Sequence, residues 1–467
     1  MTRAIIAAFV VQVVLSAAVA DCQPAGPSQV DESSFYQSLA LGKGARAWGM
    51  GGVQIALPDG AASSSSNPAA LAAVTGRSVS FSFSGDWLRG DLIRARFAVP
   101  QSGQTTTGSI TRTLATASGT AIDFAGFSTP LAIRGHRFVV AASFNRQLTF
   151  GRETRTAYQF RNQSLYRFDY DYSSTVNGTG SFQNISGSLA ARVAPRVTAG
   201  ATLRYWFGGP STTRTEAYQY SLGDYYGWSG EWSEAFANRV DFRVSGVSAD
   251  VGIVVSPGDW LFAGLVYRTS LDATLRHANS ASYRSDSTNE SLSANHAGKG
   301  RLSLPASLGF GAAVRLWPRL VVSIDHLRTA WSTSRLSGFS QTTAQGGVSR
   351  PQTYLFPTMK SVSLSVDGIA AQSDTARTAA GAEYTFGGER ALSLRGGAFY
   401  QQAYFDYRGP DIYQGTDAAP PTPGTTGITA GAGMCFRRMT LDVAWVGQRS
   451  PGSFVRHSVL TTLGVVF

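Results

Sequence analysis

Residues 301–315 read RLSLPASLGFGAAVR and decide the fold class that the sequence predicts. Apolar residues fill the even positions, which is the period-2 pattern of a β-strand with two different faces. The apolar set is Leu302, Leu304, Ala306, Leu308, Phe310, Ala312 and Val314, and the opposite set is Arg301, Ser303, Pro305, Ser307, Gly309, Gly311, Ala313 and Arg315. In a soluble sandwich the second face would be charged and β-branched. A face of Ser and Gly suits the crowded lumen of a transmembrane β-barrel, with the apolar face turned to lipid.

Similar strands recur along the chain, and the connections between them alternate in length. We expect further strands at 78–96, 138–148, 197–207, 380–386, 392–400, 428–436, 439–445 and 457–467. Short turns are expected at 316–319, 387–390 and 437–438, and long polar loops at 208–239, 278–300, 332–374 and 401–425. Outer-membrane barrels likewise have short turns at their periplasmic rim and longer loops at their extracellular rim. At about ten residues each the strands number about fourteen, an even count if both ends of the barrel lie on the short-turn side.

Composition and charge further narrow the classes of protein to which the chain could belong. No stretch after Leu15 approaches the roughly eighteen apolar residues of a membrane helix, so a membrane crossing must be made by strands. The formal net charge is +11, which could indicate nucleic acid or an anionic surface. There is no Lys/Arg run beyond pairs such as Arg437-Arg438. We therefore expect no nucleic-acid partner, with the charges spread over loops and a wet interior.

The first twenty residues resemble an export signal. Arg3 precedes an apolar run from Ala4 to Leu15, and small residues ending at Ala20 follow. A lipoprotein signal is the alternative because Cys22 lies close by, but Asp21 stands where a small residue should precede a lipidated cysteine. The expected division is a signal peptide at 1–20, an N-terminal plug at 21–77 and a barrel at 78–467.

The last strand is expected to close the barrel. Residues 457–467 carry Val459, Leu463, Val465 and Phe467 on one face. A closing strand that ends in Phe resembles the targeting signal of outer-membrane barrels, which the barrel-assembly machinery reads. The alternative is an ordinary soluble edge strand. Together with the export signal, this strand predicts the outer membrane of a Gram-negative bacterium, with membrane lipid as a partner.

Residues 21–77 differ from the rest, because they are rich in Gly and Ala, which permit close backbone contacts. Together with Ala45-Arg46-Ala47, an Asp59 turn and Asn67-Pro68-Ala69, the barrel segments 304–309, 381–386 and 440–444 make the chain resemble the FadL/TodX family of outer-membrane transport proteins. The resemblance implies a fourteen-stranded barrel, an internal hatch that includes Arg46, Trp48, Asn67, Pro68 and Ala69, and a hydrophobic ligand site. The hatch stretch is also similar to that of PorV-like barrels, which serve protein secretion.

Candidate ligand-binding residues lie on and after the strand at 197–207. Period 2 turns Arg204 inward with Trp206, where the guanidinium could hold a ligand carboxylate. The alternative is an arginine paired with a neighbouring acid or with the plug. The segment that follows is unusually aromatic and is a candidate capture surface, or else an interfacial girdle: Tyr218, Tyr220, Tyr225, Tyr226, Trp228, Trp232 and Phe236.

The turn geometry predicts pairs in the wall. If Phe386 opposes Leu392, Glu383 falls opposite Arg395 as a structural ion pair. Asp442 likewise falls opposite Gly433, which leaves room for Arg46 nearby. Cys435 faces inward, and a disulfide with Cys22 would tether the start of the plug to the wall.

No catalytic site is expected. The histidines have no Ser-His arrangement on one strand face, there is no metal-ligand spacing, and no Gly-rich loop precedes a helix. No enzyme activity, cofactor or metal is predicted. The predicted function is passive uptake of hydrophobic molecules such as long-chain fatty acids or aromatic hydrocarbons. The alternatives are a PorV-like barrel with a protein partner and a general porin, while the cargo, a lateral opening and the oligomeric state stay open.

Overall fold

The computed structural model describes residues 43–101, 104–117, 121–162, 168–225, 228–286, 289–337, 374–387, 390–402, 424–450 and 454–467. Fourteen antiparallel strands close into a barrel, as the sequence predicts. In ring order they are β1 (Ser78–Gln101), β3 (Ala121–Ile133), β4 (His136–Thr149), β6 (Phe168–Ala194), β7 (Val197–Tyr225), β8 (Trp228–Gly258), β9 (Leu261–Arg268), β12 (Ser307–Trp317), β13 (Leu320–Thr329), β15 (Thr375–Phe386), β16 (Arg390–Gln401), β17 (Thr425–Phe436), β18 (Met439–Ser450) and β19 (Phe454–Val466). The last strand pairs with the first, from Ser78 opposite Val466 to Arg89 opposite Val455.

The outside of the barrel is an apolar band. Large hydrophobic side chains are exposed on most of its strands, for example Phe127 (43%), Leu203 (61%), Phe310 (55%) and Ile428 (62%). This exposure would be costly in water, because each apolar Å² left in water costs about 25 cal/mol. The band therefore faces lipid. None of the helices in the described part of the chain is long and apolar enough to cross a membrane.

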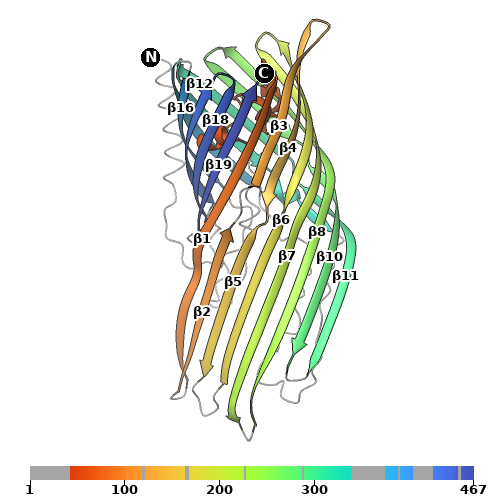
Figure 1. Cartoon of the computed structure of the whole chain (residues 1–467), viewed down its shortest axis with the longest axis vertical. Helices are drawn as coiled ribbons and strands as arrows, with labels where there is room; N and C mark the ends of the chain where they lie inside the picture. Colours follow the sequence, from red (N-terminus) through yellow and green to blue (C-terminus); the bar gives the residue numbers. More distant parts are fainter. Residues whose placement is uncertain are drawn as a thin grey trace.

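One side of the barrel continues far beyond this band as a curved sheet (Figure 1). β7 and β8 run on as long strands, and five further strands complete the sheet: β2 (Gln104–Ala117), β5 (Arg152–Asn162), β10 (Leu271–Ser285), β11 (Glu290–Leu304) and β14 (Arg335–Ser337). β2 pairs with β1 and β5, β5 also pairs with β6, and β10 pairs with β8, β11 with β10, and β14 with β11. We call this sheet the extension. The predicted loops at 208–239 and 278–300 are therefore wrong, because these residues lie mostly in paired strands. Those at 332–374 and 401–425 lie mainly outside the described residues.

The two faces of the sheet exchange character where the extension begins. In the band, Leu203 and Tyr205 point outward and Arg204 is buried. Further along the same strand the outward positions are small and polar, such as Thr215 and Gln219, which are exposed. The outside of the extension thus meets water, and the apolar residues there line the inside.

A pair of opposed breaks produces the exchange in the neighbouring hairpin. β9 stops at Arg268 and β10 starts at Leu271, while β11 stops at Leu304 and β12 starts at Ser307. Leu271 lies opposite Leu304 and Arg268 opposite Ser307, so the two breaks face each other. The continuous strand expected at 301–315 is therefore two strands. The inward–outward alternation shifts by one residue across each break, which moves the side chains that follow to the other face. Leu302 and Leu304 therefore pack inside the extension, whereas Leu308 and Phe310 face lipid.

Residues 43–77, which we call the lumenal segment, fill the barrel inside the band. The segment contains α2 (Ala45–Gly49), η2 (Gly60–Ala62), α3 (Ser63–Ser66) and η3 (Pro68–Ala73). α2 packs against β16 to β19, and η3 against β4, β6, β7 and β8. A short helix η4 (Trp331–Thr333) lies elsewhere, after β13. The predicted signal peptide lies outside the described residues.

Candidate functional site

Glycines in the wall let the lumenal segment lie against the strands. Gly200 of β7 and Gly252 of β8 are paired neighbours. A Cβ at Gly200 would lie 2.5 Å from the Pro68 carbonyl carbon, and one at Gly252 would lie 1.9 Å from Asn67 Oδ1. Asn67 is fully buried and its amide donates to the Ile55 carbonyl at 2.8 Å. The Ser- and Gly-rich inward face inferred from the sequence is therefore the seat of this segment.

A buried ion network joins the lumenal segment to the opposite wall. Arg46 donates to both Glu383 oxygens at 2.9 and 2.8 Å. Arg395 donates to Glu383 and to Asp442, each at 2.6 Å. The predicted registers, Glu383 opposite Arg395 and Asp442 opposite Gly433, are confirmed. Arg46 contacts Glu383 rather than Asp442. Burial opposes the charge on Arg46, but the hydrogen bonds with Glu383 outweigh it and raise the pKa of Arg46.

Trp48 lies on the same side of the lumen. Its ring meets Phe399 edge-on, with centroids 6.1 Å apart. The Arg377 guanidinium lies 5.2 Å from the Trp48 ring centre and 4.7 Å from that of Phe399, a distance at which a cation is attracted to an aromatic face. Ala69, on the other side, is fully buried and donates its N–H to Asn67 Oδ1 at 3.1 Å.

Arg204 is buried and fully engaged with protein groups. It is 3% exposed, forms an ion pair with Asp250, and donates to the Ser64 carbonyl of the lumenal segment at 3.0 Å. This is the alternative stated from the sequence, in which the arginine pairs with an acid and with the plug. Around it lies a polar layer in which Asn145 Nδ2 donates to Asn184 Oδ1 at 3.3 Å.

An apolar lining lies inside the wall just beyond this polar layer. Trp206 stacks on Phe182 with ring centroids 4.8 Å apart, and its indole N–H donates to Ser248 at 2.8 Å. The cluster, which we call the apolar lining, comprises Leu148, Phe182, Val244, Leu271, Ala273 and Leu275, with Phe150, Trp206, Phe242, Leu302 and Leu304 packed against it. The sequence analysis identifies only Trp206 of this set, because it turns Leu302 and Leu304 toward lipid and expects no strand at Phe182.

Further out, stacked rings cover the inner face of the extension. Tyr218 and Tyr220 lie nearly parallel, and Tyr220 stacks on Trp232 at 5.1 Å. Tyr170 and Tyr172 of β6, which sequence reasoning missed, join them at 5.2 Å from Tyr220 and 5.0 Å from Tyr218. We call these five residues the aromatic ladder. The Tyr172 and Tyr218 hydroxyls both donate to Glu216, at 3.0 and 2.8 Å.

Burial and the Glu216 carboxylate raise the pKa of Tyr218, so its hydroxyl stays a donor at neutral pH. Phe236 is half-buried at an inward position of β8. Tyr225 and Trp228 are paired at the tip of the β7–β8 hairpin, and Tyr226 lies outside the described residues.

Cys22 also lies outside the described residues, so its disulfide with Cys435 stays a prediction. Cys435 lies on the inward face of β17 and is partly buried.

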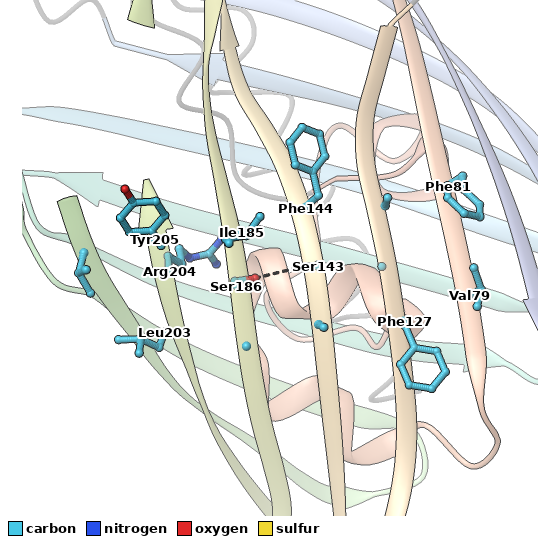
Figure 2. Close-up of a pocket in the computed structure, with 15 residues that line it drawn as sticks. Val79, Phe81, Phe127, Ser143, Phe144, Ile185, Ser186, Leu203, Arg204 and Tyr205 are labelled. Atoms are coloured by element: carbon cyan, nitrogen blue, oxygen red, sulfur yellow. Dashed lines mark hydrogen bonds between the residues drawn. The ribbon is translucent and has the colours of Figure 1, made fainter. Parts of the chain in front are cut away.

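The wall is thin next to Arg204, where an open groove of about 710 Å³ crosses its lipid-facing side. Val79, Phe81, Phe127, Phe144, Ile185, Leu203 and Tyr205 line it, with Arg204 behind them, and the lumenal segment lies directly behind the strands (Figure 2). Small residues form the floor: Ser143 and Ser186 hydrogen bond across β4 and β6 at 2.7 Å, and Ser64 of the lumenal segment contacts Ser143 at 3.0 Å.

The fold is that of an antiparallel β-barrel that crosses a membrane with its strands, holds a segment of its own chain in the lumen, and carries apolar side chains on the inner face of its extension. Residues 16–413 match the family described as outer membrane protein transport protein (OMPP1/FadL/TodX). The chain belongs to this family, which confirms the resemblance read from the sequence. It therefore resides in the outer membrane of a Gram-negative bacterium and serves the uptake of hydrophobic molecules. The family is one of transport proteins rather than enzymes.

Solved structures show the same fold. The toluene transporter TodX of Pseudomonas putida is 16% identical, with a TM-score of 0.54 over 92% of this chain and 99% of that chain. TbuX, a toluene transporter of Ralstonia pickettii, is 15% identical with a TM-score of 0.52 over 92% and 99%. CymD, a monoaromatic hydrocarbon channel, is 15% identical with a TM-score of 0.53 over 92% and 98%. The comparison with curated protein sequences finds no match.

Proposed function

We propose that small hydrophobic molecules, aromatic hydrocarbons or long-chain fatty acids, collect on the aromatic ladder, move along the apolar lining to the top of the lumenal segment, and leave sideways through the thin wall into the membrane. The observation that carries this route is the change at the start of the extension, where the apolar side chains pass from the outer face of the sheet to its inner face. A sheet that meets water on its outside keeps its apolar residues on the inside. Transfer of cargo from water to this lining is favourable by about 25 cal/mol per Å².

The lumenal segment acts as the hatch in this proposal. It packs against both sides of the barrel wall, so we expect it to block the passage of polar solutes. Arg204 links the hatch to the wall through the Ser64 carbonyl, directly beneath the apolar lining. Cargo that displaces the Ser64 contact would loosen the floor of the groove, because Ser64 also contacts Ser143. No coupling to an ion or nucleotide and no chemistry on the cargo are part of this function.

The relatives of known structure support a small aromatic cargo, since two of them are toluene transporters. A flat cargo also suits the Phe182–Trp206 stack, because aromatic rings gain about 0.5–1.5 kcal/mol from stacking beyond the area they bury. A fatty acid would need a partner for its carboxylate, and Arg204 is already paired with Asp250. Aromatic hydrocarbons are therefore the cargo we favour.

Binding measurements on matched variants test the route. Trp206→Ala removes half of the stacked pair and should weaken toluene binding by about tenfold, given that a buried large side chain contributes about 1.5–3 kcal/mol. Phe310→Ala is the control, because Phe310 is a lipid-facing aromatic, 55% exposed, on the far strand β12. Equal loss in both variants, or none in either, would refute the apolar lining as the binding surface.

Deletion of the protein separates transport from the secretion alternative. We expect slower growth on aromatic hydrocarbons at limiting concentration and an unchanged set of secreted proteins. An altered set of secreted proteins with normal hydrocarbon uptake would favour the PorV-like alternative. A large, steady conductance in planar bilayers would instead favour a general porin.

A further inference from the structure

The short-turn rim of the barrel, which faces the periplasm, is strongly basic. Exposed arginines stand at most of its turns: Arg77, Arg134, Arg137, Arg192, Arg196, Arg315, Arg319, Arg437 and Arg438. Among the described residues of these turns the acidic groups are Asp259 and the carboxyl terminus at Phe467. We call this set the arginine rim. It accounts for much of the formal positive charge that the sequence analysis assigned to loops and a wet interior.

The arginines of the rim differ from those elsewhere in their partners. Inside the barrel Arg146 pairs with Asp123, and Arg395 with Glu383 and Asp442. Within the described residues, the structure records no ion pair for any arginine of the rim. Their contacts are with backbone or rings instead: Arg137 donates to the Val74 carbonyl, and Arg315 to that of Asp259 at 3.1 Å. Among the described residues, the positive charge of the rim therefore exceeds the negative charge and is not held in ion pairs.

An apolar groove opens in the lipid-facing wall at one corner of this rim. It has a volume of about 490 Å³ and is separate from the groove beside Arg204. Its lining includes Phe138, Leu189, Val193, Ala199, Ile253 and Leu265. Phe138 directly follows Arg137 in β4, and Val193 directly follows Arg192 in β6.

Strand pairing brings this groove and the basic turns together. Phe138 lies opposite Ala191, so the β3–β4 turn, with Arg134, and the β6–β7 turn, with Arg196, are neighbours at the rim. An apolar groove that ends at guanidinium groups with no ion pair among the described residues matches one type of molecule, an amphiphile with a negatively charged head. Guanidinium groups bind phosphate oxygens in bidentate fashion, and basic residues at a membrane surface attract anionic lipids.

We propose that this corner binds an anionic phospholipid of the periplasmic leaflet, with its phosphate held by Arg134, Arg192 and Arg196 and one acyl chain in the groove. The site is independent of the transport route, which uses the inside of the extension and the other groove. An acidic periplasmic protein is the competing partner for the same charges. It would not need the groove, and this difference decides the test.

The test uses the full chain in bilayers of phosphatidylcholine with spin-labelled phosphatidylglycerol or spin-labelled phosphatidylcholine as probe. The fraction of immobilised label gives the relative affinity of the protein for each lipid. We expect a preference for phosphatidylglycerol of at least about threefold, which salt reduces by screening. Arg134→Gln, Arg192→Gln and Arg196→Gln together should remove it. The control triple, Arg243→Gln, Arg276→Gln and Arg301→Gln, changes charge equally at exposed positions of the extension and should leave the preference unchanged.

A second pair of variants tests the groove. Ala199→Trp fills it while leaving every arginine in place, and should reduce the preference. Ala430→Trp adds the same ring at an exposed position of β17, away from the groove, and should not. The proposal is overturned if the wild-type chain shows no preference, if both arginine triples behave alike, or if filling the groove has no effect while the rim triple does; the last result would point to charge alone and to the protein partner.

Discussion

Gly252 of β8 lies against Asn67 of the lumenal segment so closely that a Cβ there would sit 1.9 Å from Asn67 Oδ1. Gly252→Ala should therefore push the hatch off the wall, at a cost of about 1–3 kcal/mol for overpacking. Gly187→Ala is the matched control, because a Cβ at Gly187 meets nothing within 4 Å. Thermal unfolding in detergent should show a lower Tm for the first variant only. An unchanged Tm for Gly252→Ala would mean that the hatch is not seated as described.

Glu383 is the shared acceptor of Arg46 and Arg395. Glu383→Gln removes the carboxylate that Arg46 and Arg395 share, although Asp59 stays near Arg46 and Asp442 stays paired with Arg395, and we expect a loss of about 1–3 kcal/mol. The hatch should detach on that side, giving larger and longer channel openings in planar bilayers. Glu153→Gln also breaks an ion pair with an arginine, Arg155, but that pair is solvent-exposed and should contribute about 0–1 kcal/mol. Equal conductance in the two variants would contradict the role of the network as a tether.

Asp59 should make hatch stability depend on pH. Burial raises its pKa above 3.8, against the opposing effect of Arg46. The folded protein then holds this proton more tightly than the unfolded chain, so stability is highest at low pH and falls as pH rises from about 3.8 through the raised pKa. Asp59→Asn should make that fall smaller, and the Tm of this variant should exceed the wild-type Tm at neutral pH. Parallel Tm curves for the two proteins between about pH 4 and pH 7 would show that the Asp59 charge carries no cost.

In the proposed route the cargo leaves between β4 and β6, where small residues form the floor of the groove, and a covalent bond across these strands should prevent exit. Ser143 and Ser186 lie directly opposite each other, so Ser143→Cys with Ser186→Cys can form a disulfide. In a background of Cys22→Ser and Cys435→Ser, oxidation should stop uptake and reduction should restore it. Thr385→Cys with Ser393→Cys provides the control, since these residues are also paired across neighbouring strands, with hydroxyls 3.0 Å apart, in another part of the wall. Normal uptake by the oxidised Ser143–Ser186 variant would place the exit elsewhere.

The sequence predicts the parts of this structure that depend on residues close together in the chain. Period 2 gives the strands, and a short turn sets the register of its hairpin, so Glu383 opposite Arg395 followed from the turn at 387–390. The partner of Arg204 did not follow, because Asp250 lies 46 residues away and only strand pairing brings it near. Alternation also does not tell which face of a strand points outward. The two-residue breaks at 269–270 and 305–306 reverse the outward face, so Leu302 and Leu304, which the sequence predicts to face lipid, belong to the apolar lining.

These two breaks also fix the depth at which the barrel is immersed. Each strand residue advances about 3.3 Å, so sliding the protein outward would soon bring Leu308 and Phe310 into water, while sliding it inward would drag Asp272 and Thr274 into hydrocarbon. Both displacements raise the free energy, because apolar residues follow the breaks on one side and polar residues on the other. The depth of the barrel in the membrane is therefore fixed, whatever cargo the protein carries and however the hatch moves.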